Sequence, residues 1–122
     1  MSNAAKSIIV YGIYLIVIGL GFLVIPNTLL ALFGFPTTNE PWVRVVGLLL
    51  PIMAYYYLQA ARSEMLPFFR WTAHTRSMVG VWVGAFVALG IIPPMFTFFG
   101  IVELVGAIWT QLALRSSKAK TA

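Results

Sequence analysis

The side chain of this sequence that most needs a chemical explanation is Glu103, an acidic residue in an apolar run. It lies in the run FTFFGIVELVGAIWTQ, where its neighbours are Phe, Ile, Val and Leu. A carboxylate in such a setting needs a positive partner or a proton, because burial disfavours an unpaired charge. Arg44 stands in the comparable run PWVRVVG, and ionisable groups of membrane helices usually pair with one another. We therefore predict an intramembrane Arg44–Glu103 ion pair.

A different pairing is also open to Arg44. Glu40 precedes it by one helical turn, and a pair formed there would leave Glu103 protonated.

The other ionisable groups restrict the chemistry, because the chain has no cysteine, one histidine and three acidic residues. Thiolate catalysis is excluded, and a metal site built from protein ligands is disfavoured. We predict no catalytic residue, no metal and no cofactor, with a bound lipid or quinone left open.

The composition indicates the elements that must hold these residues. Of 122 residues, 61% are hydrophobic and 9% are charged, whereas soluble domains average about 45–50% apolar and about 25% charged residues. The long apolar runs lack the alternation of barrel strands, so the crossings must be helices. We predict an all-α polytopic membrane protein, a four-transmembrane-helix bundle forming one membrane domain over residues 1–122. The expected spans are residues 7–25, 41–61, 72–92 and 96–114.

The basic residues predict the orientation. The seven that flank the spans all fall on one side of the predicted membrane: Lys6, Arg62, Arg70, Arg76, Arg115, Lys118 and Lys120. The first and third connections contain no Lys or Arg, so both termini and the middle loop are expected in the cytoplasm. Because this topology explains the net charge of +5, we predict the lipid bilayer and not nucleic acid as the partner.

Two parts of the chain resemble each other. Residues 43–47 read VRVVG and residues 102–106 read VELVG, while Pro26 and Pro93 each follow an apolar span and suit the start of a short interfacial helix. One interpretation is a pair of tandem helical hairpins related by a pseudo-twofold axis along the membrane normal. The alternative is a coincidence of apolar composition. In the first case Arg44 and Glu103 occupy equivalent positions.

Helical spacing predicts which faces are buried. Arg44, Gly47, Pro51 and Tyr55 follow one stripe of the second span, and the fourth span carries a similar stripe of small and polar residues. That second stripe consists of Gly100, Glu103, Gly106 or Ala107, and Thr110. One interpretation is a cavity lined by Gly47, Pro51, Tyr55, Gly106 and Thr110. The other is that the tyrosines belong to an aromatic belt at the membrane boundary.

Two further sets of residues have a predicted role. Gly80, Gly84 and Ala88 are expected to form a ridge for close helix packing. The stretch RSEMLPFFRWTAHTR places Arg70 and His74 one turn apart beside aromatic residues, and together with Arg76 it is expected to contact lipid headgroups. The alternative is a plain cytoplasmic anchor.

The runs NEPWVRVVGLLLPIMAYYYLQAARS and GLGFLVIPNTLLALFGFP resemble the small bacterial four-helix membrane proteins of the DoxX-like group. The resemblance covers most of the chain and implies the bacterial inner membrane as its location. It also implies accessory or small-ligand roles, since that group includes a quinol-oxidase-associated subunit. No catalytic motif of the group is present to carry over.

Three functional hypotheses follow. The favoured one is a non-enzymatic accessory, scaffold or partner-binding membrane protein whose Arg44–Glu103 pair is structural, assembling with itself or with another membrane protein. The second is an oligomeric transporter or channel component for a small solute or protons. The third is a redox-associated subunit that binds a lipid or a quinone.

Overall fold

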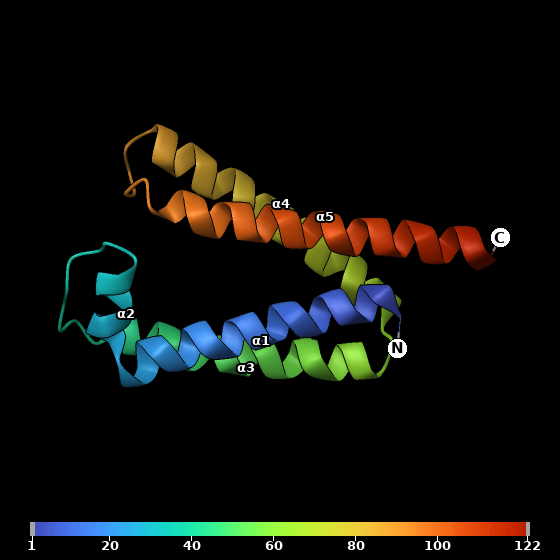
Figure 1. Ribbon diagram of the computed structural model, residues 1–122, viewed down its shortest axis with the longest axis horizontal. Coiled ribbons are helices and arrows are strands. Elements are labelled where there is room, and N and C mark those ends of the chain that lie inside the picture. Colours follow the sequence, from blue (N-terminus) through green and yellow to red (C-terminus); the bar gives the residue numbers. More distant parts are fainter. Residues whose placement is uncertain (1, 122) are drawn as a thin grey trace. The chain divides into compact units, whose positions relative to one another are not determined.

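The chain is built from α-helices connected by turns and loops (Figure 1). The computed structural model describes the backbone of residues 2–121 and the side chains of residues 2–116. The described helices are α1 (Asn3–Val24), α2 (Pro26–Leu32), α3 (Trp42–Arg62), α4 (Leu66–Ala88) and α5 (Phe96–Thr121). The all-α prediction is confirmed. The residues group into two compact units, one formed by Ile9–Gln59 and the other by the residues up to Ile8 with those from Ala60 onward.

Three described helices are long and apolar enough to cross a membrane: Asn3–Val24, Trp42–Arg62 and the Phe96–Ser116 part of α5. They coincide with three of the four expected spans. The expected span at residues 72–92 is different, because α4 begins at Leu66 and ends at Ala88. Its first half carries Arg70, His74 and Arg76, and the chain turns at Gly90, whose φ is +74°. The last residues of the predicted span therefore lie in a turn. In addition, α4 is not among the candidate spans.

In the Ile9–Gln59 unit, α1 and α3 form an antiparallel pair with a very close backbone approach. A Cβ on Gly47 would lie 2.6 Å from the backbone nitrogen of Leu23, and one on Gly19 would lie 2.5 Å from Cδ of Pro51. Only glycine permits this separation. Helix α2 begins directly after the end of α1. It has Pro26 in its first turn, as expected, and none of its residues is buried.

In the other unit, α4 and α5 form a second antiparallel pair, seen side by side in Figure 1. Gly80 lies under Leu104, since a Cβ on Gly80 would be 2.5 Å from the Leu104 Cγ. Pro93 does not begin a short helix, which corrects that prediction. Its carbonyl accepts a hydrogen bond from the Phe96 nitrogen at 3.1 Å, so the prolines lead directly into α5.

Large apolar side chains point outward from every candidate span. Val17 on α1 is 63% exposed, Ile52 on α3 is 45% exposed and Val105 on α5 is 60% exposed. In water, a protein with so many exposed apolar residues would associate, whereas in the hydrocarbon core of a membrane these residues are solvated by lipid. The fold is that of a small multi-span membrane protein.

Candidate functional site

Four polar side chains are buried together where the first turns of α1 meet α4 and α5. Arg76 is 2% exposed, Thr110 0%, Ser7 2% and Thr72 4%. We refer to these four residues as the polar cluster. All of them belong to the unit that contains α4 and α5.

Hydrogen bonds connect the polar cluster around Thr110. The Arg76 guanidinium donates from Nη2 to Thr110 Oγ1 at 2.7 Å, and it donates from Nε to the Thr72 carbonyl oxygen at 3.3 Å. Thr110 Oγ1 lies 2.7 Å from Ser7 Oγ, and either hydroxyl can be the donor. A short donor–acceptor distance from a charged guanidinium indicates a strong, charge-assisted hydrogen bond.

The hydroxyl protons of the polar cluster have two arrangements. Ser7 Oγ lies 2.6 Å from the Ala4 carbonyl oxygen, and Thr110 Oγ1 lies 3.1 Å from that of Gly106. Each hydroxyl has a single proton to donate. If Ser7 donates to Ala4, Thr110 can donate to Ser7; if Thr110 donates to Gly106, Ser7 can donate to Thr110. Thr110 accepts from Arg76 in both arrangements, so the contact with the guanidinium is preserved.

The local sequence explains why a guanidinium fits here. Thr72 precedes Arg76 by one turn of α4, which brings its carbonyl and hydroxyl within hydrogen-bond distance of the guanidinium. On α5, the residue facing the guanidinium is Gly106, where an added Cβ would lie 3.0 Å from Nη1 of Arg76. The small residue makes room for the planar charged group. Gly106 and Thr110 thus lie beside a buried side chain.

The depth of the polar cluster follows from α5. With a rise of about 1.5 Å per residue, Thr110 lies about 9 Å along the helix from Ser116 and about 21 Å from Phe96, the two ends of the candidate span. Since α4 packs alongside α5, Arg76 has a similar depth when α5 crosses the bilayer. A charge at this depth is costly and marks a structural or functional site. The polar cluster is therefore our candidate site.

The expected Arg44–Glu103 ion pair is not seen. Arg44 Nη1 donates to the Leu23 carbonyl oxygen at 2.8 Å, and Glu40 accepts from the indole nitrogen of Trp42. Among the side chains described, Arg44 forms no salt bridge with Glu103 or with Glu40, so the alternative Arg44–Glu40 pair is absent too. Glu103 is half-buried on α5. It lies between Gly100, which packs against Val83 of α4, and Gly106, which faces Arg76.

On α5 the buried residues follow the predicted stripe, whereas on α3 the buried face differs from the predicted one. Gly100, Ala107 and Thr110 are buried. On α3 Gly47 is buried and Pro51 is half-buried, but Arg44 and Tyr55 are exposed, Tyr55 by 60%. The buried residues of this helix are instead Val43, Gly47, Ala54, Ala60 and Ala61. The contact between Gly47 and α1 sets this face, so Tyr55 does not line it.

The expected ridge on α4 is used only at one position in the described structure. Gly80 is buried against α5, but a Cβ on Gly84 would meet nothing within 4 Å, and Ala88 is exposed. The buried face of α4 instead follows Phe69, Thr72, Ala73, Arg76 and Gly80. The face continues through Val83 and Val87, which are half-buried, whereas successive steps of four residues drift about 40° around the helix and carry Gly84 and Ala88 to its side.

The three residues expected at lipid headgroups separate into two groups. Arg70 and His74 are exposed on α4, whereas Arg76 is buried in the polar cluster. The prediction was wrong in placing Arg76 at the membrane surface, because it treated every arginine of the segment as a flanking charge. It also missed Ser7 and Thr72. The i, i+4 spacing of Thr72 and Arg76 was the available signal.

A second polar contact fixes the start of α1. Ser2 Oγ accepts a hydrogen bond from the Ala5 backbone N–H at 3.1 Å, as an N-cap does, and donates to Glu64 Oε2 at 2.7 Å. The Ser2 backbone N–H donates to Glu64 Oε1 at 2.8 Å. These two donors lower the pKa of the Glu64 carboxyl, the hydroxyl contributing more than the backbone. Glu64 has a positive φ of 51° in the turn before α4.

No family model, curated protein or solved structure matches the chain. The resemblance to the DoxX-like group gains no support from these comparisons. In the described residues, no three histidine, cysteine or acidic side chains are grouped so that they could hold a metal ion.

Proposed function

We propose that this chain is a non-enzymatic membrane protein of accessory or scaffold type, which acts by assembling with another membrane protein or with itself. It would cross the bacterial inner membrane four times, with both termini in the cytoplasm. The proposed crossing that is not among the three candidate spans is α4, which packs along the candidate span of α5. The exposed apolar side chains supply the surface that lipid or a membrane partner would cover.

The polar cluster is the observation that carries this proposal. Its guanidinium donates to groups of the protein itself, Thr110 Oγ1 and the Thr72 carbonyl, and Thr110 links it to Ser7 near the start of α1. An intramembrane arginine used in this way fixes how three segments pack. The hydrogen bonds of the polar cluster therefore serve the fold.

The experiment compares folding with transport. Arg76→Met and Thr110→Val are reconstituted in liposomes, and their thermal stability and their solute or proton flux are measured. A structural cluster predicts a lower unfolding temperature in both variants and no specific flux in the unchanged protein. Variants that remain as stable as the unchanged protein but lose a measurable flux would contradict the proposal.

A transporter component is the second candidate, because one helix pair holds both a buried arginine and a half-buried glutamate. Arg76 and Glu103 lie on α4 and α5, and ionisable residues within membrane helices often mark a proton or ion path. Four helices enclose little space, so such a path would need several copies of the chain. Proton uptake that Glu103→Gln abolishes, without loss of folding, would favour this candidate.

Double-mutant cycles test whether Glu103 is energetically coupled to an arginine. Glu103→Gln is combined with Arg44→Met in one cycle and with Arg76→Met in the other. Coupling with Arg44 supports the pair predicted from VRVVG and VELVG, whereas coupling with Arg76 gives Glu103 a partner within its own helix pair. Additive effects in both cycles would exclude a structural pair.

The two compact units support a further part of the proposal, the tandem hairpins related by a pseudo-twofold axis. Each unit contains one antiparallel helix pair, formed by α1 with α3 or by α4 with α5. The closest contacts differ, with Gly19 against Pro51 in one pair and Gly80 against Leu104 in the other. Any repeat therefore concerns the hairpin and not its detailed packing. An accessory role is also what the DoxX-like resemblance implies.

A further inference from the structure

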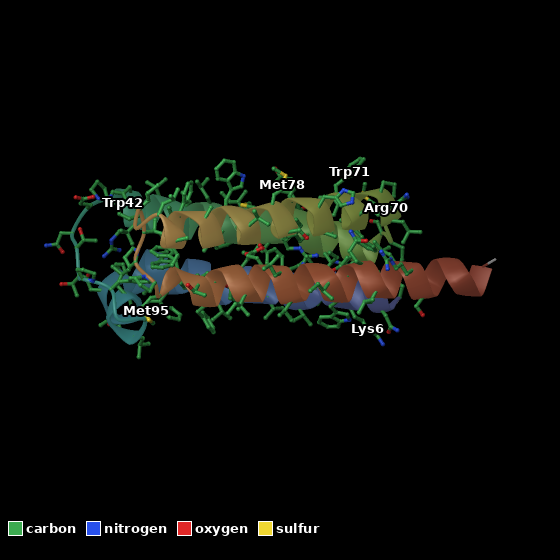
Figure 2. The ribbon with its side chains drawn as sticks, turned by 90° about the horizontal axis from the view of Figure 1, so that it is seen from above. Lys6, Trp42, Arg70, Trp71, Met78 and Met95 are labelled. Atoms are coloured by element: carbon green, nitrogen blue, oxygen red, sulfur yellow. The ribbon has the colours of Figure 1, made fainter. Side chains whose placement is uncertain are left out.

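The outward face of α4 changes from polar to apolar along its length. This face, which we call the α4 stripe, consists of Arg70, Trp71, His74, Met78, Val81 and Trp82, all of them exposed. Figure 2 shows Arg70, Trp71 and Met78 projecting from the same side of the helix. Cationic and aromatic groups occupy its first turns, and apolar groups occupy the rest.

The position of this change corresponds to a membrane boundary. Arg70 precedes Arg76 by six residues, which is about 9 Å of helix, and Thr110, the partner of Arg76, lies about the same distance from the end of the α5 span. Arg70 therefore lies level with the end of that span. Trp71, which is 61% exposed beside it, is the residue type that favours the headgroup region.

The charges of the stripe indicate what binds there. It contains a permanent cation, Arg70, and a second donor one turn deeper, His74, and it contains no acidic residue. Among the side chains described, the other exposed cations of this unit are Lys6, Arg62 and Arg115, and they lie outside the stripe, while the nearby carboxylate of Glu64 accepts hydrogen bonds from Ser2. An excess of positive charge at a membrane boundary attracts anionic lipid.

We propose that the α4 stripe binds an anionic phospholipid. Arg70 and His74 donate hydrogen bonds to its phosphate, Trp71 lies at the level of its ester groups, and an acyl chain follows Met78 and Val81. The apolar continuation favours a lipid over a soluble phosphate compound, because Met78 and Val81 are 58% and 67% exposed. Arg76 takes no part, since it is buried. This proposal rests on membrane embedding and not on the structural role of the polar cluster.

Lipid retention measured by native mass spectrometry tests the proposal. The full chain is reconstituted in nanodiscs with equal amounts of phosphatidylglycerol and phosphatidylcholine, then released and weighed with its bound lipids. We expect Arg70→Gln to reduce the preference for phosphatidylglycerol about fivefold. His74→Gln should reduce it less. Arg115→Gln is the matched control, because it removes the same charge from an exposed position on α5 and should leave the preference within about twofold.

Two outcomes would overturn the proposal. Equal losses in Arg70→Gln and Arg115→Gln would mean that diffuse charge attracts the lipid, and equal retention of both lipids by the unchanged chain would mean that no headgroup is selected. Arg70 is exposed, so Arg70→Gln should retain the unfolding temperature of the unchanged chain. A failure here is thus distinguishable from a failure of the structural proposal, which concerns Arg76 and its unfolding temperature.

Discussion

Arg76 on α4 donates a hydrogen bond from Nη2 to the hydroxyl oxygen of Thr110 on α5, with 2.7 Å between the two atoms. Both side chains are at least 98% buried. This contact connects a charge that cannot reach water with a helix that is apolar enough to span a bilayer. The packing of α4 against α5 therefore depends on satisfying one guanidinium.

Replacing Thr110 should measure what this hydrogen bond contributes. Thr110→Val keeps the size of the side chain but removes the acceptor, and we expect a loss of about 1–2 kcal/mol in the free energy of unfolding. Thr110→Ser keeps the hydroxyl and should lose less than about 1 kcal/mol. Denaturant titration in detergent micelles gives both values. A larger loss in Thr110→Ser than in Thr110→Val would show that the methyl group, and not the hydroxyl, carries the effect.

Glycine substitutions should separate close packing from open surface. Gly47→Ala places a Cβ 2.6 Å from the Leu23 nitrogen, so α1 and α3 must move apart, with an expected cost of about 1–3 kcal/mol. Gly84→Ala is the control, because its Cβ would meet nothing within 4 Å. Alanine favours helix, so that variant should be unchanged or more stable by up to about 1 kcal/mol. Thermal unfolding in one detergent compares them, and a Gly84→Ala variant as unstable as Gly47→Ala would contradict this account.

The contact between Ser2 and Glu64 should make the start of α1 sensitive to acid. Hydrogen bonds from Ser2 lower the pKa of Glu64 below its ordinary value of 4.5. A lowered pKa means that the carboxylate contributes stability above that ordinary value, and that the contribution is lost as the pH falls through the lower, folded-state pKa. Amide exchange at Ala5 and Lys6, corrected for intrinsic rates, should accelerate in that range. In Glu64→Gln the protection should be lower at neutral pH and independent of this titration, whereas Glu40→Gln should behave as the unchanged chain.

Cysteine labelling should decide whether α4 crosses the membrane. The chain has no cysteine, so single replacements can be made without removing natural thiols. With four crossings, Thr37→Cys and Met95→Cys should react with a membrane-impermeant maleimide from outside intact cells. Ser63→Cys should react only after permeabilisation. If α4 lies on the cytoplasmic side instead, Met95→Cys will be protected together with Ser63→Cys.

Composition and hydropathy were sufficient for the fold class, because the number and length of apolar runs depend little on tertiary contacts. The faces of the helices were harder to predict. Tyr55 lies on a stripe of small and polar residues, yet the face of α3 that is buried is set by the fit of Gly47 against the backbone of α1. That fit depends on the pairing of two distant segments, and one helix's own spacing does not reveal it.

The site was missed for a related reason. An arginine near the end of an apolar run is usually a flanking charge, and the sequence predicts that position for Arg76. Its burial depends on Thr72 one turn earlier, on the space left by Gly106 and on the hydroxyl of Thr110, which lies 34 residues away. The Ser7 contact spans an even longer separation. Contacts between residues so far apart in the sequence can be recognised only when the packing of α4 against α5 is known.

The hydrogen bond between Ser7 and Thr110 joins residues separated by 103 positions. On a ribosome adding roughly 5–20 residues per second, Ser7 would be made on the order of 5–20 s before Thr110. During that wait the Ser7 hydroxyl has the Ala4 carbonyl 2.6 Å away, and Arg76 has the Thr72 carbonyl on its own helix. The Ser7 hydroxyl and the Arg76 guanidinium therefore have acceptors on their own helices at first, and α5, which is synthesised after them, completes the network.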